Sequence, residues 1–492
     1  MKFDKSTQNF WGGYWREVKN GRSFEVFNPA SGEVCARVAE ASRDDVLSAI
    51  DAAALAGESW AGLAHTKRAG FLLKAADIME ERRQDFVDAL VQEAGSWIGK
   101  AMFETAYSIE ALRAAAAMVF HMNGEILPSE YGKLSMAVRE PLGVVSVISP
   151  WNFPLLLSVR GFAVAMAIGN TIVLKPSEES PLSGGLLLAE VLKAVGLPAG
   201  VFNVVTCSRG GISGLGDELV VNPAVRGISF TGSTEVGRHI ATLAGSLLTK
   251  ACVELGGKDA LIILDDADLD KAVSAATFGT YMHQGQICMS VERIIVHESV
   301  ADEFTRRLVA NVKTLRVGDP ASMDHVIGPL INEKQLENVH GQVTEAIEQG
   351  ATLLTGGQFR DLFYEPTVLS GVTRDMKIFR EETFGPVAAL ITVDDAEEAI
   401  AVANDSDYGL SAGIFTADEQ RGMEVARRLE TGMAHINDSS VNDEAHAPFG
   451  GVKNSGLGRQ NGKASVEAFS ELRWITLERG GRQYPPPFNE KI

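Results

Sequence analysis

The chain has 492 residues, 45% of them hydrophobic, which is enough for two or three domains with cores of their own. Its formal net charge of −19 at pH 7 argues against a nucleic-acid or anionic-membrane partner and for a soluble protein. Four widely spaced cysteines without a CxxC pair fit neither a disulfide scaffold nor a zinc site, and with no apolar leader or membrane-length segment they favour a reducing, cytoplasmic location.

The first part of the chain predicts a short β segment and then a layer of helices. Residues 10–40 carry strand-like pieces and the turn Asn28-Pro-Ala-Ser-Gly32, which is typical of a hairpin. Residues 123–141 alternate like a second hairpin, a candidate for pairing outside its own domain. Between the two hairpins, alanine-rich periodicity predicts helices over residues 44–56, 66–82, 84–95 and 100–122.

Strands and helices alternate through the middle of the chain, which predicts a parallel sheet. Ligands of such sheets bind at the carboxyl ends of the strands, where the polar motifs of this region lie. The expected strands are residues 143–149, 171–175, 202–205, 227–230 and 250–254, with helices over 155–169, 183–195 and 233–244.

A second alternation begins with a strand at residues 260–264 and predicts a second α/β domain. Cys288 lies in its first helix-to-strand turn, and Glu254 ends the domain before it, so the two could meet at the interface between the domains. The other expected elements are helices over 269–280, 300–315, 333–349 and 418–429, and strands over 291–297, 388–393, 412–415, 435–437 and 471–478.

Cys288 is the first candidate for chemistry. A lone cysteine is more often buried and structural. At a backbone turn, however, its own N–H can stay free to stabilise the oxyanion that forms when a nucleophile attacks a carbonyl. Only a few per cent of an unperturbed thiol is ionised at neutral pH, so Cys288 would need a base or a positive potential beside it.

A series of motifs runs in order along almost the whole chain. They are Pro150-Trp-Asn-Phe-Pro154, Lys175-Pro-Ser-Glu178, Phe230-Thr-Gly-Ser233, Glu254-Leu-Gly-Gly257, Gly285-Gln-Ile-Cys288, Glu381-Glu-Thr-Phe-Gly-Pro386 and Pro448-Phe-Gly-Gly451. The set resembles the NAD(P)-dependent aldehyde dehydrogenase superfamily. This resemblance implies an α/β fold with two doubly wound parallel-sheet domains and a small β oligomerisation element. The implied division is residues 1–122 and 142–256 for a Rossmann-like NAD-binding domain, 257–455 for the catalytic domain, and 123–141 with 470–492 for oligomerisation.

The resemblance also implies a reaction. Cys288 attacks the aldehyde, hydride leaves the thiohemiacetal for the nicotinamide, and a thioester remains. Glu254 is implied as the base that activates water to hydrolyse the thioester, although a solvent-facing glutamate is the commoner case. Family members that pass the acyl group to coenzyme A usually lack this carboxylate, so a free acid is the expected product. Asn152 is implied as the side-chain donor to the oxyanion, with a plain turn-capping role as the alternative.

NAD is the implied cofactor. A Gly-x-Gly-x-x-Gly motif is absent, but Ser233 at a helix N-terminus can donate to a pyrophosphate. Lys175 and Glu178 are implied to hold the adenosine ribose, and a carboxylate there accepts from a 2′-hydroxyl and repels a 2′-phosphate, so NAD is expected over NADP. The other implied cofactor residues are Pro150, Trp151, Gly232, Leu255, Glu382 and Phe384, and no metal is expected.

The aldehyde is predicted to be aromatic. The run His283–Met289, with His435–Asp438 and Asn442–Glu444, is similar to bacterial benzaldehyde, vanillin and salicylaldehyde dehydrogenases, and a flat apolar slot would accept an aryl ring. Arg160 could meet a ring hydroxyl or carboxylate, or be a helix-surface arginine paired with an acid. The implied pocket residues are Tyr107, Phe153, Leu156, Arg160, Ile287 and Met289, together with residues from 435–446.

Other interpretations stay open. An aliphatic or semialdehyde dehydrogenase would use the same machinery, with Arg160 holding a distal carboxylate. A non-catalytic cofactor-binding or structural member is disfavoured by the intact Cys288, Glu254 and Asn152, and a plain thiol esterase would leave the cofactor residues without a role. The resemblance further implies a homodimer or homotetramer, and exposed strand edges at the hairpin and terminal strand favour one too.

Overall fold

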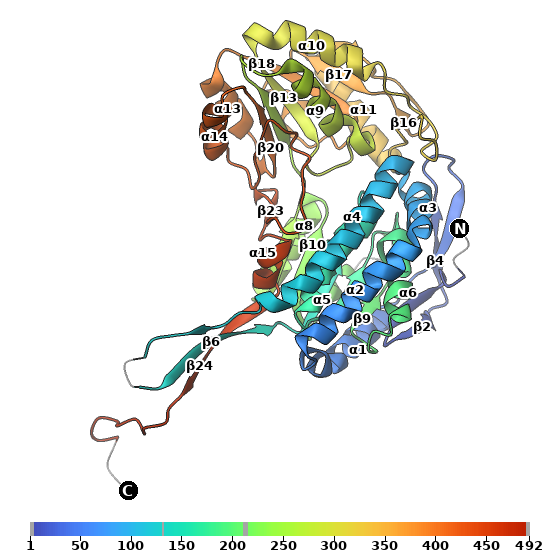
Figure 1. Ribbon diagram of the computed structural model, residues 1–492. Helices are drawn as coiled ribbons and strands as arrows, with labels where there is room; N and C mark the ends of the chain where they lie inside the picture. Colours follow the sequence, from blue (N-terminus) through green and yellow to red (C-terminus); the bar gives the residue numbers. More distant parts are fainter. Residues whose placement is uncertain (1–3, 130–131, 210–214, 489–492) are drawn as a thin grey trace.

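The computed structural model describes residues 4–129, 132–209 and 215–488, and it shows two α/β bodies with a β sheet projecting from one of them (Figure 1). The predicted α/β fold is confirmed. The ends of the predicted NAD-binding and oligomerisation segments, at 1–3 and 489–492, lie outside the described residues, as do 130–131 of the hairpin and 210–214. The division into domains stays a prediction.

The first body is built on a sheet with five parallel central strands. These are β9 (Phe202–Val204), β8 (Thr171–Lys175), β7 (Val144–Ile148), β10 (Val225–Thr231) and β11 (Lys250–Glu254), in that spatial order. Antiparallel strands complete its edges, namely β1 (Gln8–Trp11) and β2 (Tyr14–Glu17) on one side and β23 (Gly456–Leu457) on the other.

Helix α5 (Pro154–Ala167) is the buried helix of this body. Pro154 starts it without costing a hydrogen bond, because the first N–H of a helix has no partner in the helix. Gly161 lets it approach β7 closely, since a Cβ there would lie 2.6 Å from the Val147 side chain. The other helices are α1 (Arg43–Ala61), α2 (His65–Glu81), α3 (Arg83–Ala94), α4 (Ile98–Ala117), α6 (Leu187–Ala194), α7 (Leu215–Val221) and α8 (Thr234–Ser246).

The second body carries a sheet of seven strands in the order β14-β17-β18-β13-β12-β20-β21, all parallel except the edge strand β14. The strands are β14 (Thr352–Thr355), β17 (Thr367–Ser370), β18 (Val387–Val393), β13 (Val291–His297), β12 (Asp259–Ile263), β20 (Ala412–Phe415) and β21 (His435–Ile436). Its helices are α9 (Leu269–Tyr281), α10 (Glu298–Val312), α11 (Glu333–Glu348), α12 (Lys377–Arg380), α13 (Ala396–Asn404) and α14 (Glu419–Arg428).

The chain then returns to the first body. Gly456 in β23 pairs with Glu254 in β11, and α15 (Gly462–Ala468) follows close by (Figure 1). The segment before Gly456 contacts both candidate regions, since Ser440 Oγ donates to the carbonyl oxygen of Met289, next to Cys288, and a Cβ on Gly450 would meet the Glu254 carboxylate.

The projecting sheet joins two segments far apart in the sequence. Strand β6 (Leu134–Pro141) pairs antiparallel along its whole length with β24 (Ser470–Leu477), and β5 (Glu125–Ile126) lies on its other side. The expected hairpin therefore pairs with the expected terminal strand. Among the described residues, none of the helices has the length and apolar character needed to cross a lipid bilayer.

Candidate active site

Cys288 lies in the turn between α9 and β13, as predicted, and two cavities meet at it. One has a volume of about 520 Å³ and the other about 180 Å³. The turn is conformationally strained, because His283 and Gln284 adopt positive φ angles of 49° and 56°, which side chains other than glycine rarely take. Gln286 helps to fix it, since its Oε1 accepts a hydrogen bond of 3.0 Å from the Ile331 N–H.

The surroundings of the Cys288 thiol disfavour its ionisation. Burial raises its pKa above the ordinary value, and the carboxyl groups of Asp259, Glu254 and Glu382 raise it further, while the guanidinium of Arg160 acts in the opposite direction. The thiol is therefore protonated at neutral pH, and forming the thiolate requires a base at the moment of reaction.

Glu254 ends strand β11 and is 2% exposed, so the alternative of a solvent-facing glutamate is wrong. Neither carboxyl oxygen has a hydrogen-bond partner among the described residues. Burial raises the pKa of this carboxyl well above its usual range, against the lowering effect of Arg160 and Arg459. A buried carboxyl with free oxygens and a raised pKa suits a general base working near neutral pH.

Asn152 lies in the turn between β7 and α5 and is 4% exposed. It lines both cavities together with Cys288. Its side-chain Nδ2 donates to the carbonyl oxygen of Gln286, two residues before Cys288, over 3.0 Å. The amide is thus a buried donor beside the thiol rather than a surface turn cap, which is the placement that oxyanion stabilisation needs.

The larger cavity has an almost entirely apolar wall, and all six residues expected in the substrate pocket line it. From the stretch 435–446, residues Val441, Asn442 and Asp443 reach it. Sequence reasoning missed several aromatic lining residues. One signal was available, because Phe103 precedes Tyr107 by one helical turn on α4 and so shares its face. The missed aromatic residues are Trp97, Phe103, Phe278, Tyr281 and Phe449.

Two positively charged side chains, Lys100 and Arg160, also line this wall, and Arg160 is the centre of a polar cluster. The alternative of a helix-surface arginine paired with an acid is correct only in part, because Arg160 is 7% exposed and therefore buried, but it is paired with an acid, Asp443. Its guanidinium also stacks 4.1 Å above the Phe449 ring. Arg160 Nε has no hydrogen-bond partner within the described part of the chain, whereas the Tyr107 hydroxyl is a direct neighbour of the Asp443 carboxylate. Buried polar groups usually have partners, so the Nε–H of Arg160 is positioned for a ligand.

The smaller cavity gathers most of the residues expected to hold the cofactor. Lys175 and Glu178 lie outside its lining, where they form an ion pair of 3.7 Å, and Arg209 contacts Glu178 at 3.3 Å. Ser233 caps the N-terminus of α8, so this helix start faces the cavity, as a phosphate site requires. The expected cofactor residues that line the cavity are Pro150, Trp151, Gly232, Ser233, Leu255, Glu382 and Phe384.

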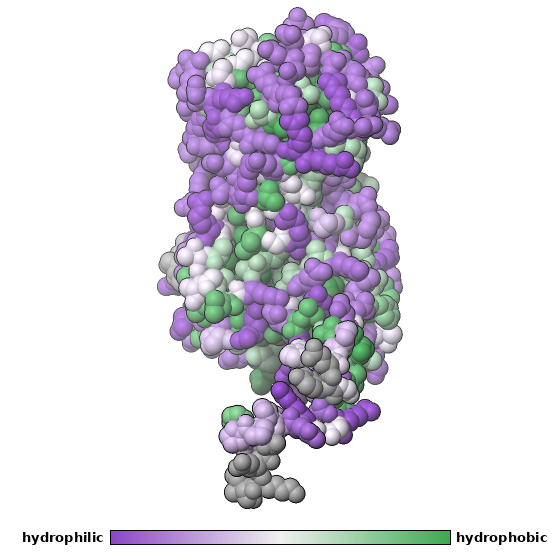
Figure 2. Space-filling model, turned by 90° about the vertical axis from the view of Figure 1, so that its left-hand side faces the viewer, coloured by the Kyte–Doolittle hydropathy of each residue, from purple (hydrophilic) through white to green (hydrophobic). Residues whose placement is uncertain are grey.

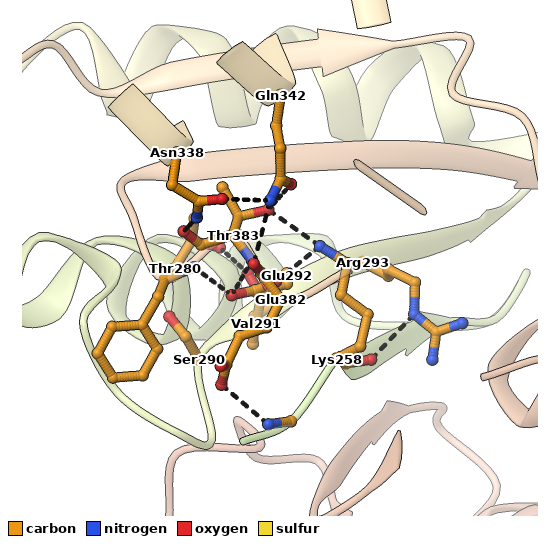
Figure 3. A network of polar contacts seen from close by, with 12 residues as sticks. Lys258, Thr280, Ser290, Val291, Glu292, Arg293, Asn338, Gln342, Glu382 and Thr383 are labelled. Atoms are coloured by element: carbon orange, nitrogen blue, oxygen red, sulfur yellow. Dashed lines mark hydrogen bonds and ion pairs between the residues drawn. The ribbon is translucent and has the colours of Figure 1, made fainter. Parts of the chain in front are cut away.

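The loop carrying Glu382 and Phe384 is held by a buried ion pair that sequence reasoning missed (Figure 3). Lys258 Nζ lies 2.6 Å from a Glu292 carboxylate oxygen, and that carboxylate accepts hydrogen bonds from the Thr383 and Phe384 N–H groups. Phe384 has a positive φ of 53°, so the loop is held in a strained form. The signal was present as two adjacent charged residues, Glu292 and Arg293, in the strand Val291–His297, which is otherwise mostly apolar.

These surroundings fit a dinucleotide. Glu382 accepts a hydrogen bond from the Gly257 N–H over 3.0 Å, and its burial raises the pKa of its carboxyl to about 8. Gly256 leaves space beside it, because a Cβ there would lie 2.5 Å from the Glu382 carboxylate. Trp151 and Phe384 meet edge to face at 5.6 Å and form an apolar wall suited to a planar ring.

Comparison with known proteins identifies relatives over nearly the full length. Residues 15–475 match the aldehyde dehydrogenase family. A vanillin dehydrogenase of Pseudomonas fluorescens is 45% identical, covering 96% of this chain and 98% of that protein. An NAD(+) benzaldehyde dehydrogenase of Pseudomonas putida is 42% identical, covering 96% of each. The crystal structure of a salicylaldehyde dehydrogenase from Pseudomonas putida G7, complexed with salicylaldehyde, superposes with a TM-score of 0.95 at 40% identity, covering 97% of this chain and 99% of that one.

Proposed function

The chain belongs to the aldehyde dehydrogenase family, whose members oxidise aldehydes to acids with NAD or NADP, and from this premise we propose that it oxidises aromatic aldehydes with NAD. The observation that carries the proposal is the apolar cavity that ends at Cys288 and contains one polar cluster, made of Arg160, Asp443 and Tyr107, in which Arg160 Nε has no partner among the described residues. A cavity of this size and composition suits an aryl ring carrying a polar substituent.

The residues of the site divide the reaction between them. The Cys288 thiol gives up its proton to solvent, Sγ adds to the carbonyl carbon, and Asn152 Nδ2 with the Cys288 backbone N–H stabilises the resulting oxyanion. NAD, which Trp151, Ser233, Glu382 and Phe384 would hold in the smaller cavity, would supply the hydride acceptor, and loss of hydride from this carbon leaves a thioester on Cys288. Glu254 then takes a proton from water, whose oxygen attacks the thioester carbonyl. The Cys288 thiolate leaves, is reprotonated, and the free acid is released.

The preference for NAD over NADP rests on Glu178. Its carboxylate can accept from the 2′-hydroxyl of the adenosine ribose and repels a phosphate at the same position. Arg209, which pairs with Glu178 at 3.3 Å, reduces that repulsion, so we expect NADP to be a poorer coenzyme rather than an inactive one. The relative named as an NAD(+) benzaldehyde dehydrogenase supports the same preference.

The charge of the Arg160 cluster favours a phenol over an acid. Asp443 already neutralises Arg160, so a substrate carboxylate would meet a negative neighbour as well as a positive one. A ring hydroxyl can instead donate to Asp443 and accept from Arg160 Nε or from the Tyr107 hydroxyl. This argues against the alternative of a semialdehyde whose distal carboxylate is held by Arg160.

A substrate panel tests this proposal. We expect kcat/KM to be highest with a hydroxybenzaldehyde and lower with benzaldehyde. With succinic semialdehyde it should be at least about tenfold lower than with benzaldehyde, because only the aryl substrates fill the apolar cavity. NAD should exceed NADP by about tenfold or more with the same aldehyde. The measurement is initial NADH or NADPH formation by the purified enzyme. A higher kcat/KM for the semialdehyde, or for a straight-chain aldehyde, would contradict the aromatic assignment.

We further propose that the projecting sheet assembles the enzyme into a homodimer or a dimer of dimers. Leu472 and Trp474 on β24 are 59% and 68% exposed, which is unusual for large apolar side chains. Figure 2 shows hydrophobic patches on the body from which the sheet projects, whereas the other body is mostly hydrophilic. A second copy that covers this sheet would remove those side chains from water.

Deleting the residues after Ser470 should leave a monomeric or aggregating protein, because β6 would lose its partner along its whole length. The mass from light scattering, measured at several protein concentrations, gives the result. A deletion that starts after Leu477 is the matched control, since it removes the proline-rich tail but keeps β24, and it should assemble like the full chain. A stable dimer of the shorter protein would refute the assignment.

A further inference from the structure

A second ion pair, Lys100 with Glu104, lies one turn apart on α4 and is completely buried. We propose that this pair consists of positioning residues that hold the Asn152 turn in the geometry needed to stabilise the oxyanion. The inference rests on the proposed function, because it assumes that Asn152 is the oxyanion donor. It goes further by assigning a role to two charges on a helix that contributes neither the nucleophile nor the base.

Lys100 holds the start of the turn. Its ammonium makes three hydrogen bonds, to Ser96 Oγ over 3.1 Å, to Glu104 Oε2 over 2.5 Å and to the Asn152 carbonyl oxygen over 2.6 Å. The same ammonium lies 4.0 Å above the ring of Phe153, the next residue. All of the donors of Lys100 are therefore used, and two of its contacts fix the backbone and side chain on either side of the Asn152–Phe153 peptide.

Glu104 holds the end of the turn. Its Oε1 accepts from the Leu155 and Leu156 N–H groups over 2.9 and 3.2 Å. These are free donors at the start of α5, and the residue at the N-cap position, Phe153, has no side chain able to satisfy them. The carboxylate thus caps α5 from another helix, in the place of the usual serine or aspartate.

Such an arrangement is costly, which is why we assign it a role. Removing two charges from water costs more free energy than their attraction in a buried pair normally returns. Apolar side chains of the same volume would fill the space at least as well. Apolar side chains, however, cannot form directional hydrogen bonds. Here the bonds from the pair converge on residues 152–156, whose first member carries the amide beside Cys288.

A double-mutant cycle in the full-length enzyme tests the proposal. In K100M/E104Q, the methionine keeps the volume, and the glutamine can still accept from Leu155 and Leu156. Of the contacts to residues 152–156, only those that Lys100 makes with the Asn152 carbonyl oxygen and the Phe153 ring are lost. We expect the single-turnover rate of NADH formation to fall roughly ten- to a hundredfold with little change in KM, as for a small misplacement of a catalytic group. In an Asn152→Ala background, the same pair of substitutions should change the rate by less than about twofold, because the residue they position is gone.

The Glu93→Gln variant is the matched control. Glu93 is also a buried carboxyl that accepts from backbone N–H groups at a helix start, those of Leu182 and Ser183, but it lines neither cavity. It should lower Tm without changing the single-turnover rate. An equal loss of rate from K100M/E104Q with and without Asn152, or no loss at all, would overturn the proposal. If the paired variant does not fold, K100R in the same cycle answers the question, because arginine keeps the charge but not the single-point geometry. Failure of the proposed function is distinguishable, since the unmodified enzyme would then form no NADH from aldehydes.

Discussion

Replacing Cys288 by alanine should abolish aldehyde oxidation, lowering NADH formation by about 10⁴-fold or more. Without the thiol no covalent adduct forms, and hydride would have to leave a hydrated aldehyde that the site does not orient. The substitution removes one atom from the meeting point of the two cavities and breaks no hydrogen bond of the turn. Tm should therefore change little. Steady-state absorbance of NADH, with a thermal unfolding curve for the same preparation, provides both measurements.

Cys35 gives the control for this experiment. It is a half-buried thiol on a strand of the first body, far in the sequence from the candidate site, and its Sγ donates a hydrogen bond to the Val26 carbonyl oxygen. Cys35→Ala should retain activity. A Cys288→Ser variant should be as inactive as the alanine variant, because a hydroxyl of the same size is a far weaker nucleophile at neutral pH. Appreciable turnover by Cys288→Ala would exclude the thiol as the nucleophile.

Most of the fold could be predicted because the alternation of strands and helices is regular. Strands β8, β11 and β20 begin and end at the predicted residues. The structure differs where the local pattern was weak. Strands β14 and β17 were not expected, since each has four residues and the edge strand β14 is half exposed, so it shows no clear alternation. The helix expected to end at residue 122 ends at Ala117 and continues as one tight turn to His121.

The burial of Arg160 shows what a local pattern can and cannot reveal. The segment around it is apolar on every side, and a helix of that kind is normally enclosed by its neighbours. This apolar pattern would have been enough to predict that α5, and with it Arg160, is buried, instead of leaving a surface position open for Arg160. Its partner was beyond prediction from spacing, because Asp443 follows 283 residues later in the chain.

The two buried lysine–glutamate pairs were missed for a related reason. Lys100 and Glu104 have the i, i+4 spacing of an ordinary surface pair, and nothing in the sequence shows that both are enclosed. Lys258, directly before β12, meets Glu292 on the neighbouring strand β13. In each case the carboxylate accepts backbone N–H groups from a segment that lines one of the two cavities at Cys288. The residues expected to carry out the chemistry, Cys288, Glu254 and Asn152, were thus visible in motifs, while the buried ion pairs beside them were not.

Replacing Glu254 by glutamine should stop the reaction after one turnover. The Cys288 thiol can still lose its proton to solvent, so the thiohemiacetal and the thioester still form, but the attacking water is no longer deprotonated, so hydrolysis should slow by roughly 10²- to 10⁴-fold. Rapid mixing with aldehyde and NAD should then show a burst of about one NADH per active site and almost no steady state. An equal fractional loss of the burst rate and the steady-state rate would instead mean that Glu254 also deprotonates Cys288. Unchanged turnover would exclude it as the base.

Comparison of Glu254→Gln with the unmodified enzyme at several pH values should reveal the raised pKa of the Glu254 carboxyl. In the unmodified enzyme, hydrolysis of the thioester should accelerate with rising pH through that raised pKa, because only the ionised carboxylate takes a proton from water. The contribution of Glu254 to the free energy of unfolding should change in the opposite direction and fall as pH rises. A carboxyl whose pKa is higher when folded than when unfolded loses stability as pH rises above the unfolded value, since its ionisation costs more inside the protein. Glutamine cannot ionise, so the difference in Tm in favour of Glu254→Gln should grow from pH 5 to pH 8, and a constant difference would mean that the buried carboxyl titrates normally.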